Sequence, residues 1–338
     1  MKVALDAFGS DHSPDTEIKA ANEAVKQGIE IILVGDEKKF KGVNSSVELV
    51  HADDVIAMDE SPANALRKKK NASMRIAVEL VSKGRADAVI SAGNSGAMMA
   101  ISMFILRKLT GVYRPAIVGV LPSYRGYTVF LDMGANVDCK PHYLLQFAIM
   151  GSVYAKKLFN LSNPTVGLLS NGEEEGKGNE LTSIAHELLK KSSINYKGYV
   201  EGKDIYMGDV DVIVTDGFVG NAVLKASEGV ADMITNMLKD SFKASPISML
   251  GYLFSRGAFN RLKRRVDYAE YGGAPLIGVD GLAIITHGRS NEKAILNAIR
   301  LAKRFYETKL NDAIIEELNK NLNVTDAISE KNEVDSVL

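Results

Sequence analysis

The chain has 338 residues, of which 46% are apolar and 25% charged, so it can bury a large core in one α/β domain or two smaller ones. Its net charge of −1 and pI near 6.6 lack the basic surplus of a general nucleic-acid-binding protein. The single cysteine, Cys139, excludes an internal disulfide and a cysteine-rich metal site, and fits a reducing cytosol. We expect no signal peptide and no transmembrane helix, because the longest nearly uncharged apolar run, 97–106, is too short.

The first third of the chain alternates strands and helices, which is typical of a doubly wound, largely parallel sheet. Strands are expected at 2–5, 29–34, 47–50 and 87–91, with a helix starting at Ser13-Pro14 and a helical stretch reaching Lys83. The basic run 67–70 in that stretch is interpreted as a solvated helix face. A glycine-rich turn with Asn94 and Ser95 follows the fourth strand and precedes an apolar helix over 97–109.

The rest of the chain repeats this rhythm. Further strands are expected at 116–121, 128–131, 166–169, 195–200, 212–215 and 282–286, with helices at 141–158, after Glu180, and from Glu292 to about Leu310. Three of these strands end in polar loops that carry Asp132, then Asp216 with Gly220 and Asn221, and finally His287. We expect a single α/β/α domain over 1–320 and a polar tail over 321–338.

The loop after the strand at 166–169 carries the strongest chemical signal. It contains three glutamates, glycines that include Gly176 and Gly178, and Lys177, and Asn179 precedes the next helix. A glycine-rich loop that enters a helix N-terminus offers backbone N–H groups to an anion, and Lys177 adds a full charge. A capped, solvated turn is the other interpretation of this segment. No GxxxxGK[ST] occurs, and no GxGxxG follows the first strand, so a P-loop or a dinucleotide site is not supported.

Ligands in open α/β sheets bind beyond the carboxyl ends of the strands, where loops converge. We therefore expect Asn94, Asp132, Lys177, Asp216 and Asn221 to face one cleft, although each alone also suits a turn or a helix cap.

Residues 241–266 differ from the rest because they contain six basic residues and no acids, together with apolar residues at helical spacing. Pro246, Gly251 and Gly257 predict a protruding helical hairpin over 241–268 rather than one rod. Contact with an anionic membrane or an acidic partner is predicted for Leu250, Leu253, Phe254, Arg261, Lys263, Arg264 and Arg265. A dimer contact is the alternative use of this hairpin.

Taken together, these loops resemble the bacterial phosphate acyltransferase family of phospholipid synthesis. The resemblance rests on 172–180 (GEEEGKGNE), 216–221 (DGFVGN), 271–275 (YGGAP) and the shorter matches at Asp6, Asn94, Asp132 and His287, and it covers nearly the whole chain. It implies a homodimeric, cytoplasmic, peripherally membrane-bound enzyme that makes acyl phosphate from acyl-(acyl carrier protein) and orthophosphate. It also implies an α/β/α fold akin to isocitrate dehydrogenases and phosphotransacetylases.

For this reaction we expect positioning and charge stabilisation to dominate, without a covalent intermediate, cofactor or metal. Lys177 would hold phosphate, and Asn179 or Asn221 would donate to the thioester oxyanion. Asp216 would orient Lys177 or accept the phosphate proton, and His287 would be the acid for the departing thiolate. Substrate contacts are expected from Asn94, Ser95, Asp132, Gly176, Gly178 and Gly220. A phosphotransacetylase acting on coenzyme A and a non-catalytic membrane scaffold are the alternatives.

Overall fold

The structure is a computed structural model that describes residues 1–266 and 272–324. Its strands are β1 (Lys2–Asp6), β2 (Glu30–Gly35), β3 (Glu48–His51), β4 (Ala88–Ser91), β5 (Ala116–Ile117), β6 (Gly119–Ser123), β7 (Gly126–Leu131), β8 (Thr165–Leu169), β9 (Asn195–Val200), β10 (Val212–Val214), β11 (Ala274–Ile277) and β12 (Leu282–Ile285). Its α-helices are α1 (Asp15–Lys26), α2 (Pro62–Lys68), α3 (Ser73–Ser82), α4 (Ser95–Ile105), α5 (Pro141–Phe159), α6 (Glu180–Lys191), α7 (Gly217–Lys243), α8 (Pro246–Val266), α9 (Glu292–Thr308) and α10 (Leu310–Lys320). Short 3-10 helices, η1 (Glu37–Lys39) and η2 (Asp204–Tyr206), follow β2 and β9.

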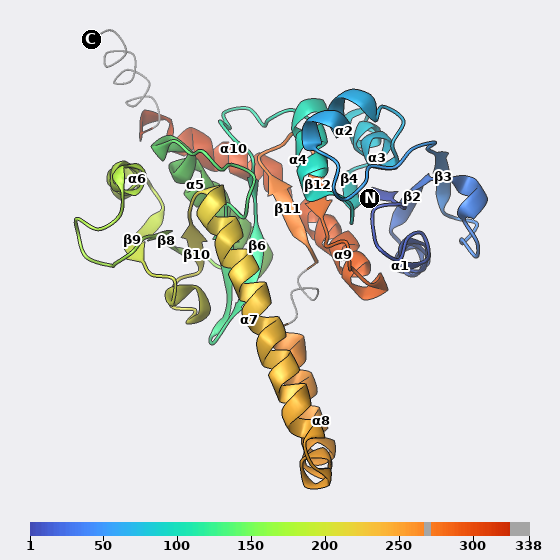
Figure 1. Cartoon of the computed structure of the whole chain (residues 1–338). Coiled ribbons are helices and arrows are strands. Elements are labelled where there is room, and N and C mark those ends of the chain that lie inside the picture. Colours follow the sequence, from blue (N-terminus) through green and yellow to red (C-terminus); the bar gives the residue numbers. More distant parts are fainter. Residues whose placement is uncertain (267–271, 325–338) are drawn as a thin grey trace.

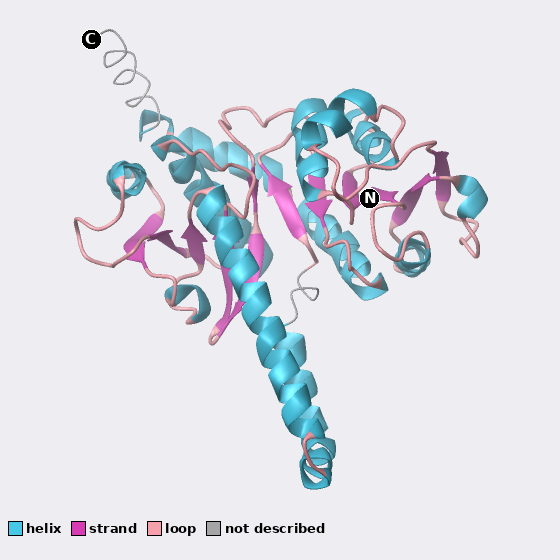
Figure 2. Ribbon diagram, in the orientation of Figure 1, coloured by secondary structure: helices cyan, strands magenta, loops and turns pink. Residues whose placement is uncertain are grey.

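The strands form two sheets (Figure 2). The seven-stranded sheet has the order β3-β2-β1-β4-β12-β11-β5, and the five-stranded sheet has the order β6-β7-β10-β8-β9. Pairing is parallel except where β11 meets β12 and β5, and where β6 meets β7. The prediction of an α/β fold with largely parallel strands is therefore confirmed, although β11, α10 and the division into two sheets were not predicted.

One hydrophobic cluster contains side chains from both sheets. Helix α5 packs on β7, β8 and β10 and also contacts α9 and α10, while α9 packs on β4 and β12 (Figure 1). Because α5 lies between these layers, its residues 144–155 are buried on every side, as its apolar sequence requires. A second cluster lies between α3, α4 and the seven-stranded sheet.

The start of the predicted tail also belongs to the folded body. The side chain of Asn321, which follows α10, is buried and accepts a hydrogen bond from the backbone N of Ser193 at 2.9 Å. The rest of the predicted tail, 325–338, lies outside the described residues. Among the described helices, none is both long enough and apolar enough to cross a membrane.

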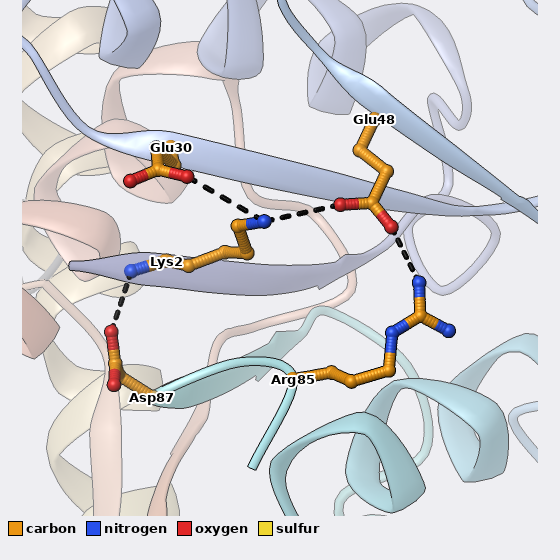
Figure 3. Close-up of polar contacts among 5 residues, drawn as sticks. All are labelled: Lys2, Glu30, Glu48, Arg85 and Asp87. Carbon is orange, nitrogen blue, oxygen red and sulfur yellow. Dashed lines mark hydrogen bonds and ion pairs between the residues drawn. The ribbon is translucent and has the colours of Figure 1, made fainter. Parts of the chain in front are cut away.

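A polar network joins the amino ends of β1 to β4 (Figure 3). The amino group of Lys2 contacts Glu48 at 3.2 Å and Glu30 at 3.5 Å, and its backbone N donates to Asp87 at 2.7 Å. Arg85 binds the other oxygen of Glu48. These contacts stabilise the end of the seven-stranded sheet at which these strands begin. The loops predicted to carry the chemistry lie at the opposite end.

The protruding hairpin is longer than the predicted 241–268. It consists of the 27-residue helix α7 and the 21-residue helix α8, which pack against each other (Figure 1). We expected Gly251 and Gly257 to break the helix, but α8 continues through both. The turn of the hairpin lies between Lys243 and Pro246. Pro246 therefore marks the start of the second helix, because proline is tolerated in the first turn of a helix.

Candidate functional site

The predicted site residues lie in loops after neighbouring parallel strands. In the seven-stranded sheet, these loops follow β1, β4 and β12, and in the five-stranded sheet they follow β7, β10 and β8. Parallel neighbours deliver their following loops to one edge, so the candidate residues form two groups, one on each sheet.

The first group is held together by close backbone contacts. A Cβ on Gly9 would lie 2.4 Å from the backbone N of Gly93, so only glycine permits this approach. The backbone N of Asp11 donates to Gly288 O at 2.8 Å, which joins the loops after β1 and β12. Beneath them, the Ser91 hydroxyl donates to the buried carboxylate of Asp6 at 2.6 Å. The three loops therefore form one continuous surface.

The side chain of Asn94 is fully engaged within the protein. Its amide nitrogen lies 2.8–3.1 Å from the carbonyl oxygens of Ala57, Met58 and Glu60, and its oxygen accepts from the backbone N of Ala97 as the cap of α4. Asn94 thus holds the segment before α2 in place. Ser95, the first residue of α4, is exposed. Substrate contact by these two residues stays a prediction.

Asp132 organises the loop after β7. Its carboxylate has no exposed surface and accepts from the backbone N of Ile117, Gly134, Ala135 and Asn136, at 2.7–3.2 Å. Burial raises the pKa of this carboxyl, and these hydrogen bonds oppose the rise. In this structure the carboxylate shapes the loop and is not presented to solvent, so its predicted contact with substrate stays untested.

The first turn of α7 rests on that same loop. Asp216 caps the helix by accepting from the backbone N of Val219 at 2.9 Å, and the N of Gly217 donates to Asn136 O at 2.7 Å. A Cβ on Gly220 would lie 1.8 Å from Asp132 O, so this position admits only glycine. The exposed side chain of Asn221 lies beside Gly134. The loops after β7 and β10 are therefore in direct contact, with Asn221 at their shared surface.

The loop after β8 is built by internal hydrogen bonds. The backbone N of Gly178 donates to the Asn171 side chain at 2.8 Å, and Asn179 caps α6 through reciprocal bonds with Thr182 at 2.9 Å. Gly176 and Gly178 both have φ of +93°, which favours glycine. Because the backbone N–H groups of Gly178 and Asn179 already have acceptors, they are not available to an anion in this structure, and the predicted anion site depends more on the Lys177 side chain.

Lys177 is exposed, and its aliphatic part lies against Gly172. We find no ion pair for its amino group within residues 1–266 and 272–324. Two of the three neighbouring glutamates point to other lysines: Glu173 pairs with Lys203 at 3.2 Å and Glu175 with Lys190 at 3.0 Å. The third, Glu174, lies on the same side as Lys177, because a Cβ on Gly172 would be 2.8 Å from its carboxylate oxygen and 2.9 Å from Lys177 Cγ.

The imidazole of His287, at the end of β12, is exposed. Its Nδ1 accepts from the backbone N of Arg289 at 3.1 Å, so in the neutral ring the proton is on Nε2. To act as an acid toward a thiolate the ring must also carry a proton on Nδ1, where Arg289 N now donates, so the predicted role of proton donor stays a prediction.

Cys139 is not suited to nucleophilic catalysis. Burial raises the pKa of its thiol to about 12, and Sγ donates to Asn136 O at 3.4 Å. The thiolate is the nucleophilic form, so a thiol that stays protonated at neutral pH is inert.

The tip of the hairpin exposes the predicted apolar residues. Leu250 is 55%, Leu253 61% and Phe254 86% exposed, and Arg261 is exposed as well. The side chains of Lys263, Arg264 and Arg265 lie outside the described ones.

Sequence reasoning missed the carboxyl group of Glu17, which is fully buried beneath the loop after β1. It also missed that Lys38 and Lys39 lie at the carboxyl end of β2, in the short helix η1. A helix-spaced pattern of apolar residues on α1 marks position 17 as inward-facing, and this signal was available.

The fold is shared with phosphotransacylases. A branched-chain phosphotransacylase from Enterococcus faecalis V583 superposes with a TM-score of 0.58 at 15% identity, covering 90% of this chain and 98% of that one. A phosphotransacetylase from Streptococcus pyogenes gives a TM-score of 0.59 at 16% identity, covering 91% and 94%. At this level of identity, the likeness concerns the fold alone.

The chain belongs to the family described as fatty acid synthesis protein, which matches residues 1–313. A relative from Pelobacter propionicus, named Phosphate acyltransferase, is 51% identical over 329 residues and covers 95% of both chains. A relative of the same name from Geobacter sulfurreducens is 50% identical over 328 residues, covering 94% of both. The resemblance predicted from the loops is therefore confirmed.

Proposed function

We propose that this protein transfers an acyl group from the thioester of acyl carrier protein to orthophosphate, which yields acyl phosphate for phospholipid synthesis. The observation that carries the proposal is the match of about 51% identity, across nearly the whole chain, to relatives named Phosphate acyltransferase. The exposed amino group of Lys177 in the loop after β8, which forms no ion pair with the described residues, supports it, because a bound phosphate needs a positive charge.

The reaction requires little covalent chemistry from the protein. A phosphate oxygen attacks the thioester carbonyl carbon, a C–O bond forms, the C–S bond breaks, and the thiolate takes up a proton. Lys177 holds the phosphate, and Asn221 donates to the oxyanion from the surface shared with the loop after β7. The hydrogen phosphate loses its proton as it attacks and the thiolate gains one, so the step balances. His287, in its protonated form, passes a proton to the departing sulfur. As the helix cap Asn179 uses its side-chain oxygen, so its side-chain nitrogen is the alternative donor to the oxyanion.

The proposal predicts that Lys177→Ala lowers the rate of acyl phosphate formation by ~10²–10³-fold, as for removal of one group that stabilises developing charge. Product formed from acyl carrier thioester is measured by mass spectrometry, with and without orthophosphate. Lys197→Ala, which removes an exposed lysine on β9, is the control and should keep full activity. Near-normal turnover of Lys177→Ala would remove this residue from the mechanism.

The two alternatives are distinguished in the same assay. A phosphotransacetylase that acts on coenzyme A would turn over acyl-coenzyme A in preference to the carrier thioester, and a scaffold would turn over neither. The apolar, basic hairpin favours an enzyme that depends on a carrier protein or a membrane, since binding of a coenzyme A thioester does not require such a hairpin.

We further propose that the hairpin has two contact faces. Its tip, with Leu250, Leu253 and Phe254, inserts into the surface of an anionic membrane, where Arg261 contacts lipid headgroups. On α7, Val230, Met233, Ile234 and Met237 are all exposed and follow the spacing i, i+3, i+4, i+7. That spacing forms one apolar stripe, which pairs with a second copy in a homodimer.

A further inference from the structure

A cluster of three aromatic side chains joins helix α6 to strand β9. The His186 ring on α6 lies against the Tyr199 ring, with 4.4 Å between the ring centroids and 13° between the ring planes. His186 Nδ1 and the Tyr196 hydroxyl are 2.7 Å apart, which is a hydrogen-bond distance. His186 and Tyr199 are buried, and Tyr196 is half-buried. We call these three residues the tyrosine–histidine cluster.

An irregularity in β9 brings the two tyrosines to one face of the strand. The neighbouring β8 residues 166 and 167 pair with Tyr196 and Gly198, which leaves Lys197 as an extra residue in β9. Side chains alternate in a regular strand, so residues three apart point to opposite faces. The extra residue reverses this alternation, and Tyr196 and Tyr199 therefore both reach His186 on α6. Gly198 has φ of +110°, a conformation that favours glycine.

The cluster is linked to the first turn of α6. Thr182 precedes His186 by one helical turn, so the two residues lie on the same face of the helix. The Tyr199 hydroxyl donates to Thr182 O at 3.4 Å. Thr182 in turn exchanges two hydrogen bonds with Asn179, each at 2.9 Å. The cluster is therefore connected, through Thr182, to the turn that directly follows Lys177.

Two exposed ion pairs also tie down the loop that carries Lys177. Glu175 pairs with Lys190 of α6, and Glu173 pairs with Lys203 after β9. Ion pairs between exposed side chains contribute only ~0–1 kcal/mol, because water and salt screen them. Hydrogen bonds and ring contacts inside the protein are not screened in this way. The tyrosine–histidine cluster is therefore the stronger determinant of where α6 begins.

The two hydrogen-bonded groups of the cluster are neutral near neutral pH. Burial lowers the pKa of His186, and the charge of Lys190 lowers it further. Burial raises the pKa of the Tyr196 hydroxyl above its ordinary value. The hydrogen bond therefore joins an uncharged imidazole and an uncharged phenol.

We propose that the tyrosine–histidine cluster positions the Lys177 turn for orthophosphate. Because the cluster fixes the first turns of α6 on β9, it determines where Thr182 and Asn179 hold the backbone that follows Lys177. Its three members are positioning residues, which act on the substrate through Lys177. The inference rests on the proposed function, in which Lys177 holds phosphate, and it adds what determines the affinity for that substrate.

The test removes the two hydroxyls of the cluster and keeps both rings. Tyr196→Phe/Tyr199→Phe loses the hydrogen bonds to His186 and Thr182. We expect KM for orthophosphate to rise about fivefold or more, as for the loss of one or two neutral hydrogen bonds. KM for the acyl carrier thioester should stay within about twofold, because the substitutions act only on the phosphate side of the reaction.

The control variant is matched in chemistry. Tyr154→Phe/Tyr306→Phe also removes two tyrosine hydroxyls, one buried on α5 and one exposed on α9. Among the described residues, the Tyr154 hydroxyl has no hydrogen-bond partner, so its loss should not disturb the fold. Both KM values of the control should match those of the wild type.

Hydrogen exchange measures the same effect without an assay of activity. The backbone N–H groups of Gly178, Asn179 and Thr182 donate to side chains of the loop and the cap. If the cluster holds the start of α6 in place, these amides should exchange faster in Tyr196→Phe/Tyr199→Phe than in the wild type or the control. Mass spectrometry of a peptide that spans 171–182 measures the exchange.

Coupling to Lys177 identifies the route of the effect. In a Lys177→Ala background, the two tyrosine substitutions should change kcat/KM for orthophosphate by less than about twofold, because the side chain that they position is absent. An equal loss in both backgrounds would mean that the cluster does not act through Lys177, which would overturn the inference.

The remaining outcomes separate this inference from the proposed function. A wild type that forms no acyl phosphate from orthophosphate would exclude the function itself. If the wild type forms it, an unchanged KM for orthophosphate in Tyr196→Phe/Tyr199→Phe would show that the positioning role alone is wrong. A fall in kcat with both KM values unchanged would indicate only a loss of folded enzyme, and it would overturn the positioning role as well. Unaltered hydrogen exchange in 171–182 would do the same.

Discussion

At the scale of single residues, Glu17 has the most unusual environment of the carboxyl groups near the site. It lies in the first turn of α1 with no exposed surface, and among the described residues neither of its carboxyl oxygens has a hydrogen-bond partner. Burial raises the pKa of Glu17 to about 7, while the nearby Ser10 hydroxyl opposes the shift and the Asp6 carboxyl adds to it. Below neutral pH, Glu17 is therefore protonated in the folded protein.

This environment predicts that Glu17 makes stability depend on pH. The folded-state pKa of Glu17 is above the ordinary value of 4.5. The stability linked to protonated Glu17 is therefore fully present below pH 4.5 and is lost as the pH rises through about 7. Between pH 4.5 and 7, the wild type should lose up to about 3 kcal/mol of unfolding free energy relative to Glu17→Gln. Denaturant unfolding at several pH values measures it.

Glu292→Gln serves as the control for Glu17→Gln, because Glu292 occupies the first turn of α9 but is exposed. This variant controls for the loss of an acidic side chain from the first turn of a helix. A flat difference for Glu17→Gln between pH 4.5 and 7 would show that the carboxyl group is solvated.

Sequence reasoning located these residues better than it assigned their contacts. Asn94, Asp132, Asn179 and Asp216 all lie at strand ends or helix starts, as strand and helix patterns predicted. Their side chains, however, bind backbone amides or carbonyls of their own or neighbouring loops. Asn and Asp serve equally well as caps and as ligand contacts, so residue type alone cannot determine where the side chain points.

At the scale of elements, helix α7 offers two glycines in contrasting surroundings. Gly220 packs against Asp132 O, whereas a Cβ on Gly229 would meet nothing within 4 Å. Gly220→Ala should destabilise the protein by ~1–3 kcal/mol, because the helix must move off the loop after β7. Gly229→Ala should stabilise it by ~0.5–1 kcal/mol through higher helix propensity.

Denaturation midpoints measure both alanine variants, and acyl phosphate formation should fall only for Gly220→Ala. Equal stability of the two variants would mean that the start of α7 is not anchored on the loop after β7.

The two proposed faces of the hairpin are separable by mutation. Leu253→Glu/Phe254→Glu should abolish flotation with anionic liposomes and leave the protein dimeric, because charged side chains oppose insertion. Met233→Glu/Met237→Glu should do the reverse, since it places acids in the stripe on α7. Phe104→Glu, an exposed aromatic on α4, is the control for both.

Liposome flotation and light scattering are the measurements for these hairpin variants. Unchanged flotation of the tip variant would exclude the tip as the membrane contact. A dimer that survives in the Met233→Glu/Met237→Glu variant would exclude the stripe.

The hairpin also shows why its boundaries escaped the sequence patterns. Gly251 and Gly257 lower helix propensity in α8, but each costs only ~1 kcal/mol and packing against α7 compensates for it. A local pattern contains no information about that partner, so the unbroken helix could not be predicted from 241–266 alone.

At the scale of the whole molecule, alternation of strands and helices predicted the α/β class but not the division into two sheets. That division occurs between β5 and β6, where Val118 N donates to Pro275 O on β11. Only one residue separates these strands, and no turn signal marks the change of sheet. Strand order depends on long-range pairing, which the spacing of apolar residues does not encode.

Helix α7 has one end in the candidate site and the other near the tip of the hairpin (Figure 1). Its 27 residues, at ~1.5 Å per residue, span about 40 Å, which exceeds the ~30 Å hydrocarbon thickness of a bilayer. With the tip at the lipid surface and α7 upright, the newly formed acyl phosphate starts its path one helix length away from the membrane. If the proposed membrane contact holds, synthesis and delivery are separate events in space, and the product crosses water or is handed to another protein before it reaches lipid.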